Sequence, residues 1–202
     1  MRKADLRHNH VRLDDAIGRY RSFMERIIAA QRVIRLVQEK RDIAESVLLR
    51  LCANWESFVD EHLVDCLNVD PSKLEDFLGV PVQAHPSKNL CTALIFGDGY
   101  RDFSSFGQLK GFTNRLLPRS SNPFFEVTKT QFKRIDEVYT IRNYLSHYSA
   151  RSKRALHGLY RDEYNMTNFI EPGQFLLGYN ARRLWSYFDA FEGASARMRD
   201  WC

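Results

Sequence analysis

The feature that most constrains the fold is the absence of proline before position 71. Proline interrupts a helix because it lacks a backbone N–H and clashes with the preceding turn. Across this proline-free stretch, apolar residues recur at steps of three and four, which is the period of an amphipathic helix. Glycine is also sparse, with 10 in 202 residues. The pattern predicts a largely helical protein.

The same periodicity predicts where the helices lie. We expect long helices over residues 13–41, 43–67, 129–148 and 180–201, with a break near Arg41 and Asp42. Shorter helices are expected over 72–78, 88–96 and 104–117, the first with Ser72 as its N-cap. The piece from Asn168 to Leu177, around Glu171-Pro172-Gly173, is predicted to be irregular. In the helix at 129–148 the core side is predicted to carry Phe132, Ile135, Val138, Tyr139, Leu145 and Tyr148.

Chain length and composition indicate one domain. A chain of 202 residues can bury one sizeable core, and its 44% hydrophobic content is ordinary for a globular protein. No internal repeat or low-complexity linker divides it. We therefore predict an all-α helical bundle over 1–202, with 70–126 as an elaboration between the core helices.

The sequence lacks the usual signs of export or membrane insertion. It has no run of eighteen apolar residues, and the first residues are polar. Its four cysteines show no C-x-x-C pairing, and no carboxylate or cysteine cluster accompanies His8 and His10. We expect a cytoplasmic protein with reduced cysteines, no membrane association, no metal site and no cofactor.

A group of polar side chains is predicted in the last turns of the helix at 129–148. Arg142 and Ser146 are four residues apart, as are Asn143 and His147, so each pair shares a helix face. A cation, an amide, a hydroxyl and an imidazole are thus brought together. An imidazole can exchange a proton with a ribose 2′-hydroxyl or a leaving 5′-oxygen, and a guanidinium can bind the scissile phosphate. These groups suit metal-independent RNA cleavage.

The motif Arg142-Asn143 followed by three residues and His147 resembles the R-x4-6-H signature of the HEPN superfamily. The upstream run from Trp55 to Val59, Trp-Glu-Ser-Phe-Val, is similar to the acidic second-helix segment of the stand-alone, RNase-like branch of that superfamily. The resemblance covers the helices at 43–67 and 129–148 and, loosely, the final helix. It says little about 70–126.

The resemblance implies an all-α bundle that forms a homodimer and cleaves single-stranded or loop RNA to 2′,3′-cyclic phosphate ends. Such proteins often act as toxins of toxin–antitoxin systems or as antiviral effectors, so an antitoxin or other regulatory protein is an implied partner. By this resemblance the catalytic positions are Arg142, Asn143 and His147, with Glu56 as the second-helix acid.

Basic and aromatic residues follow this motif closely. Basic side chains can bind phosphates while aromatic rings stack on bases. The mild net charge of +5 permits such a partner without requiring one. The candidate RNA-binding residues are Ser146, Tyr148, Arg151, Lys153 and Arg154.

Each of these residues also has a structural interpretation. His147 can be a helix-terminal residue that favours the C-terminal dipole. Arg142 can form a structural ion pair with Glu56 or Asp136. Glu56 shares a face with apolar residues, so it either has a partner, Arg142 or His147, or extends to solvent. The basic segment can be a solvated helix face, and the whole protein a non-catalytic HEPN module that binds RNA, a nucleotide or a partner protein.

Overall fold

The computed structural model describes residues 3–30, 37–97, 103 and 105–201, the side chain of Trp201 excepted. Every regular element in this part of the chain is helical, and the predicted all-α class is confirmed. The α-helices are α1 (His8–Ala29), α2 (Val37–Val69), α3 (Ser72–Leu78), α4 (Lys88–Phe96), α5 (Phe106–Leu116), α6 (Lys129–His147), α7 (Ala150–Tyr164) and α8 (Pro172–Trp201). Two short 3-10 helices, Arg119–Ser121 and Pro123–Phe125, lead into α6.

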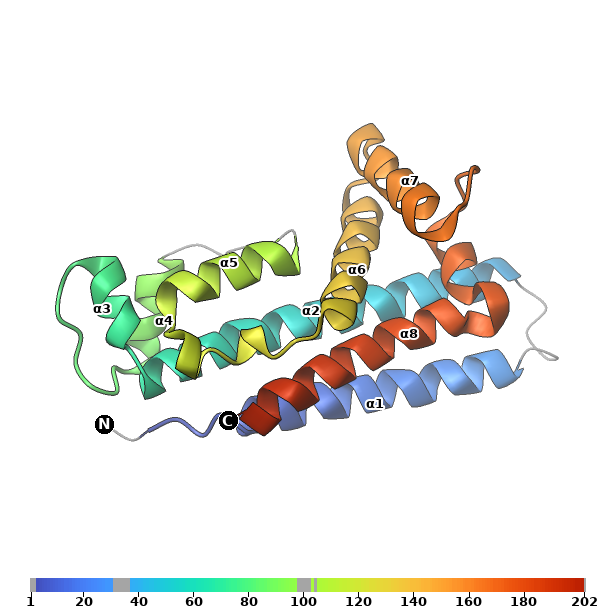
Figure 1. Ribbon diagram of the computed structural model, residues 1–202. Coiled ribbons are helices and arrows are strands. Elements are labelled where there is room, and N and C mark those ends of the chain that lie inside the picture. Colours follow the sequence, from blue (N-terminus) through green and yellow to red (C-terminus); the bar gives the residue numbers. More distant parts are fainter. Residues whose placement is uncertain (1–2, 31–36, 98–102, 104, 202) are drawn as a thin grey trace.

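Three long helices, α1, α2 and α8, lie side by side and form the body of the molecule (Figure 1). Their shared core is aromatic: Trp55 of α2 is fully buried and meets Phe191 of α8 at a ring-centroid distance of 5.2 Å. His62 is buried and stacks on Phe58. Burial of such large apolar surfaces is the main stabilising contribution in a bundle of this kind.

Helix α6 crosses the body and projects from it, and α7 folds back beside it (Figure 1). The start of α6 is held by a capping box in which Thr128 and Gln131 bond reciprocally. It ends where Tyr148 takes a left-handed conformation with φ 44°. Ser149 and Ser152 form a second capping box that starts α7 directly afterwards. The sharp reversal between α6 and α7 therefore comes from local backbone chemistry.

Residues 70–126 contain the predicted short helices, which gather over the C-terminal end of α2 (Figure 1). The start of α3 differs from the prediction. Pro71 occupies the N-cap position, one residue earlier than expected, and Asp70 accepts hydrogen bonds from both the N–H and the hydroxyl of Ser72, the first helical residue. The carboxylate of Asp70 is the stronger acceptor for an unsatisfied N–H at a helix start.

Two boundaries were predicted wrongly. The chain is helical through Arg41 and Asp42, where the break was expected, and Asp42 accepts a hydrogen bond from Gln38 one turn earlier. Residues 31–36, predicted to be helical, lie outside the described residues. Pro172 opens α8 in the segment predicted to be irregular. Proline is tolerated in the first turn of a helix, where its missing N–H has no partner to lose.

Gly173 shows why this entry to α8 needs a small residue. A Cβ there would lie 2.5 Å from the Cβ of Arg41, and the Gly173 N–H donates to Glu45 at 2.6 Å. The close approach fixes the start of α8 against α2.

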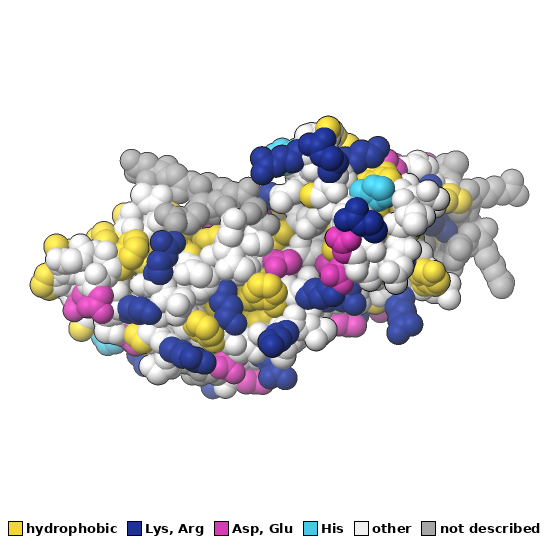
Figure 2. Space-filling model, turned by 45° about the horizontal axis from the view of Figure 1, so that its top comes forward, with side chains coloured by type: hydrophobic (Ala, Val, Ile, Leu, Met, Phe, Trp, Pro, Cys, Tyr) yellow, Lys and Arg dark blue, Asp and Glu magenta, His cyan; other side chains and the backbone are white. Residues whose placement is uncertain are grey.

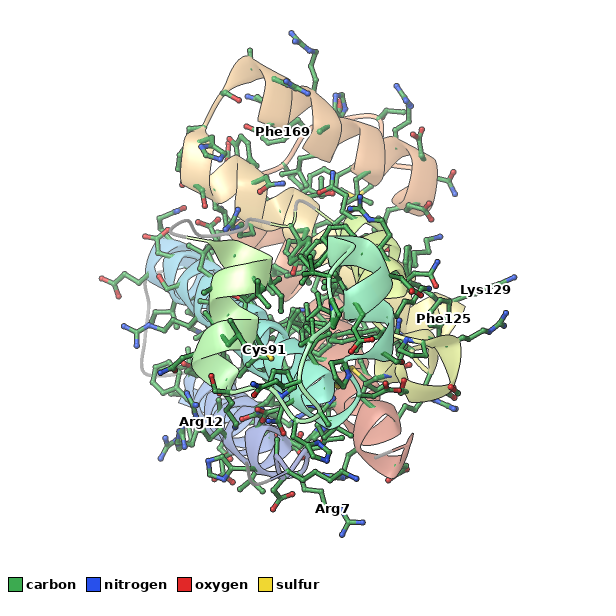
Figure 3. The ribbon with its side chains drawn as sticks, turned by 90° about the vertical axis from the view of Figure 1, so that its left-hand side faces the viewer. Arg7, Arg12, Cys91, Phe125, Lys129 and Phe169 are labelled. Atoms are coloured by element: carbon green, nitrogen blue, oxygen red, sulfur yellow. The ribbon has the colours of Figure 1, made fainter. Side chains whose placement is uncertain are left out.

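Two further findings concern the cysteines and the apolar lengths of the helices. The thiols of Cys52, Cys66 and Cys91 are buried and form no disulfide, and Figure 3 shows Cys91 in the interior; Cys202 lies outside the described residues. In the described part of the chain, no helix has the length and apolar character needed to cross a membrane.

Candidate active site

The predicted polar group lies in the last turns of α6, at the end that projects from the body (Figure 1). Arg142 and Asn143 are half-buried, whereas Ser146 and His147 are exposed. The Arg142 guanidinium donates to the side-chain oxygen of Asn143 at 3.1 Å. The structure thus places a supported cation five residues before an accessible imidazole.

Helix α2 supplies the acid beside Arg142. An oxygen of Glu56 lies 3.4 Å from a guanidinium nitrogen of Arg142, and the two side chains are 14% and 17% exposed. The Cys52 thiol, one turn earlier, lies 3.8 Å from the same carboxylate. A charge this poorly solvated needs a partner, and Arg142, one of the two predicted for Glu56, lies beside it.

Two further carboxylates flank this pair. Asp136, the other predicted partner of Arg142, instead accepts the backbone N–H of Phe106 at 2.6 Å. Asp60, one turn after Glu56, is half-buried; burial, with smaller repulsions from Glu56 and Glu61, raises its pKa to about 6. Negative charge is therefore concentrated on this part of α2, which favours a cation at Arg142.

His147 stands apart from the Glu56 contact. Its side chain is exposed, and among the described residues no hydrogen bond or ion pair is recorded for it. An imidazole in this position can meet a solvent-borne ligand without first breaking an internal contact. It also lies in the last turn of α6.

Three of the predicted RNA-binding residues lie on α7, which follows the motif directly. Arg151, Lys153 and Arg154 are exposed along α7, and Figure 2 shows basic side chains gathered over that end of the molecule. Tyr148 was placed on the core side by periodicity, but it is 66% exposed because the left-handed turn rotates it outward. Its ring centroid lies 5.2 Å from that of Tyr144.

One basic residue of this surface has an internal contact. The Lys153 ammonium lies 4.4 Å from the ring centroid of Phe169, which sits at this end of the molecule (Figure 3). Phe169 also packs edge-on against Tyr144, at a centroid distance of 5.5 Å. The segment after α7 is thereby tied to the end of α6, which braces the helix that carries the motif.

Sequence reasoning missed a second charged group on α6. Glu137 is 2% exposed and accepts hydrogen bonds from Arg134, at 2.8 and 2.9 Å, and from the hydroxyls of Tyr164 and Tyr187. The available signal was its position next to Val138 in the apolar stripe of the helix. A carboxylate there requires buried donors.

The described residues include no group of three or more His, Cys, Asp or Glu side chains placed to hold a metal ion. No protein-family model matched the chain, and comparisons with curated proteins and with solved structures gave no significant match.

Proposed function

We propose that this protein is a metal-independent endoribonuclease that cleaves single-stranded or loop RNA to 2′,3′-cyclic phosphate ends. The observation that carries the proposal is the arrangement at the end of α6. There Arg142 is supported by Glu56 and Asn143, five residues before an exposed His147. The resemblance of this motif to the HEPN signature points to the same chemistry.

In the proposed reaction, neutral His147 accepts the proton of the ribose 2′-hydroxyl. The 2′-oxygen attacks phosphorus, the bond from phosphorus to the 5′-oxygen breaks, and the 5′-oxygen takes up a proton from solvent or from a protonated imidazole. Arg142 binds the phosphate oxygens and stabilises the charge that grows on them. Asn143 and Glu56 act as positioning residues, because their contacts are to Arg142.

The proposed substrate path runs from the motif along α7. Arg151, Lys153 and Arg154 are exposed there, beside the exposed ring of Tyr148. Such a surface binds the backbone of a single strand electrostatically and stacks its bases without sequence preference. We further propose a homodimer, as in the HEPN superfamily, in which two copies of the projecting end of α6 face a shared cleft. A toxin or antiviral role, with a neutralising protein partner, follows from the same resemblance.

A second candidate is a non-catalytic module that binds RNA, a nucleotide or a partner protein. The observation in its favour is the engagement of Arg142 by Glu56, with only 17% of the arginine side chain exposed. A structural arginine would have such contacts. In this case substitutions of Arg142 or His147 change binding, and no variant cleaves RNA.

The test is cleavage of a labelled mixed-sequence RNA in EDTA, with His147→Ala against the parent. His8→Ala is the matched control, because His8 is also an exposed histidine at a helix end. Removing a general acid–base group lowers the rate by about 10²- to 10⁴-fold. We expect the parent and His8→Ala to produce 2′,3′-cyclic ends and His147→Ala to lose this activity. Cleavage by His147→Ala at the parental rate would refute the role of His147, and no cleavage by any variant would favour the binding module.

A further inference from the structure

A pocket of about 370 Å³ lies where α6, α7 and α8 meet. We call it the three-arginine pocket, after its lining residues Arg134, Tyr164, Tyr179, Arg182, Arg183 and Ser186. Sites for small molecules enclose about 300–1,000 Å³, so this pocket is large enough for a ligand of modest size. Its lining contains three arginines and no acidic residue, which favours an anionic ligand.

Arg134 and Tyr164, which line one side of the pocket, are held by hydrogen bonds to the buried Glu137. Both oxygens of the buried Glu137 accept from the guanidinium of Arg134, which also donates to the Tyr164 hydroxyl at 2.6 Å. Tyr187 completes the network from α8, with its hydroxyl 3.0 Å from Glu137. Arg134 and Tyr164 are therefore fixed before any ligand arrives, which lowers the entropy lost on binding. Glu137 offsets the charge of Arg134, so Arg182 and Arg183 supply the excess positive charge.

Arg183 is held flat inside an aromatic cage. Its guanidinium carbon lies 4.4 Å from the ring centroid of Phe175, 4.9 Å from that of Tyr179 and 5.1 Å from that of Tyr164. One of its nitrogens donates to the Phe175 carbonyl at 3.1 Å. A guanidinium has five N–H donors in a planar fork, so stacking fixes its plane while leaving donors that can meet a phosphate.

The outer edge of the pocket is formed by the interruption of α8. Tyr179, Asn180 and Ala181 have positive φ values of 53°, 56° and 59°. Only glycine, and to a lesser degree asparagine, adopts this conformation readily, and such strain is concentrated at binding sites. The turn leaves the Tyr179 side chain 79% exposed beside Arg183, where its ring offers an open stacking face.

We propose that the three-arginine pocket binds a nucleoside 5′-monophosphate group. Arg182 and Arg183 pair with the phosphate, and Tyr179 stacks on the base, which is the combination that arginine and exposed tyrosine provide for nucleotides. The group can belong to a free nucleotide or to the 5′-phosphorylated end of an RNA. Arg134 and Arg142 are eight residues apart on α6, roughly 12 Å along the axis. The site is therefore distinct from the motif at the end of that helix and does not depend on its chemistry.

The first experiment is calorimetric titration of adenosine 5′-monophosphate into the full chain. The variants are Arg182→Ala and Tyr179→Ala, at exposed positions, and the matched control is Arg197→Ala, an exposed arginine on α8 outside the pocket. Circular dichroism establishes that each variant is folded. We expect one saturable site in the parent, weakened by about 10- to 100-fold in Arg182→Ala and by about 5- to 100-fold in Tyr179→Ala. Arg197→Ala should stay within about twofold of the parent, because a distant surface charge acts only through a screened field.

Further titrations identify the source of the group. Adenosine and inorganic phosphate should each bind at least about 10-fold more weakly than adenosine 5′-monophosphate, since each lacks half of the contacts. Equal binding of a 5′-phosphorylated trinucleotide, but not of its 5′-hydroxyl form, identifies an RNA end as the ligand. Binding of the mononucleotide alone identifies a free nucleotide. The proposal is overturned if the folded parent shows no saturable binding of the mononucleotide at millimolar concentration, or if Arg182→Ala and Arg197→Ala weaken it equally.

Discussion

Two arginines of α6, Arg134 and Arg142, each pair with a glutamate, and the two pairs differ in burial and in the length of their contacts. Arg134 meets Glu137 one turn away at 2.8 and 2.9 Å, and that carboxylate is 2% exposed with two tyrosine hydroxyls on it. Arg142 meets Glu56 of α2 at 3.4 Å, with both side chains partly exposed. The first pair is compact and local, and the second is longer and joins two helices.

The difference indicates what each pair can do. A buried carboxylate with all its donors in place has a single arrangement, and exchanging a partner leaves a charge unsatisfied. At the longer Arg142–Glu56 pair, the guanidinium has five N–H donors, so Arg142 can stay beside the poorly solvated Glu56 while it meets a phosphate. Arg142 is therefore suited to bind and release a phosphate, whereas Arg134 is suited to hold its surroundings in place.

The largest effect on stability is expected from a substitution of Glu137. Glu137→Ala leaves Arg134 without its carboxylate and two tyrosine hydroxyls without an acceptor. Because Arg134 is 32% exposed, we expect a loss of about 3 kcal/mol in the free energy of unfolding, the low end for a broken buried pair. Urea unfolding measures this loss of unfolding free energy. The control is Glu163→Ala, because Glu163 is an exposed acid on α7. A loss below about 1 kcal/mol would show that the network is not held as tightly as its geometry indicates.

The buried His10 makes the free energy of unfolding depend on pH. This dependence limits the pH range in which variants of the Arg134–Glu137 and Arg142–Glu56 pairs can be compared. His10 is fully buried; Ser195 donates to Asp14, so His10 must donate to Ser195 through Nδ1. Burial lowers the pKa of His10 from 6.5 to about 4 and that of the adjacent His62 to about 3. Between pH 6.5 and 4 the unfolded chain therefore binds more protons than the folded one, and stability falls as the pH falls.

For His10 this amounts to roughly 2 kcal/mol between pH 7 and pH 5. His10→Asn keeps a donor near Ser195 and removes the titrating ring, so its unfolding free energy should change less over this range. The exposed His8→Ala should leave the slope unchanged. Parallel slopes for the parent and His10→Asn would contradict the assignment. Activity and stability of the Arg142 and Arg134 variants are therefore best compared at pH 7 or above.

Asp60, near Glu56 on α2, gives the smallest expected effect on the free energy of unfolding. Its pH dependence has the opposite sign to that of His10. Asp60 has its pKa raised from 3.8 to about 6, so the folded chain binds more protons between these values. Its contribution to stability is present at low pH and is lost as the pH rises through 6. Because Asp60 is only half-buried, Asp60→Asn should stabilise the protein by about 1 kcal/mol at pH 7 and by nothing at pH 4. Urea unfolding at both pH values measures this, against the exposed Asp76→Asn. Equal effects at the two values would rule out the titration.

Much of the fold was predictable because its signals are local. The periodic stripes of α2 and α6 and the turn residues between short helices lie within a few positions of what they determine. The irregular piece predicted at 168–177 was wrong where distant segments meet, whereas the break expected at Arg41 and the Ser72 cap were wrong because of local contacts. Gly173 looked like part of a turn, yet it starts α8 because α2 approaches it closely at Arg41. The left-handed run at Tyr179 likewise has no local signal beyond Gly178 and Asn180.

Some features of the candidate site were also predictable from helical spacing, and others were not. Helical spacing predicted that Arg142 and His147 lie near one another on α6, and the burial expected for Glu56 predicted a charged partner. Tyr148 was misplaced because periodicity was carried one residue past the end of the helix. Glu137 and Arg183 were not found from the sequence. Arg134 lies only three residues from Glu137, but the tyrosine hydroxyls that complete its network come from α7 and α8. Arg183 stacks on Phe175 and Tyr179 across the interruption of α8, and on Tyr164 of α7.

The most direct test compares the two arginines in one assay. The rate of cleavage of a labelled single-stranded RNA in EDTA is measured for Arg142→Ala and for Arg134→Gln, each shown to be folded by circular dichroism at the assay temperature. Loss of a group that stabilises transition-state charge lowers the rate by about 10²- to 10³-fold. We expect the cleavage rate to fall by this factor in Arg142→Ala and to stay near the parental rate in Arg134→Gln. Parental cleavage by Arg142→Ala, or equal losses in the two variants, would contradict it.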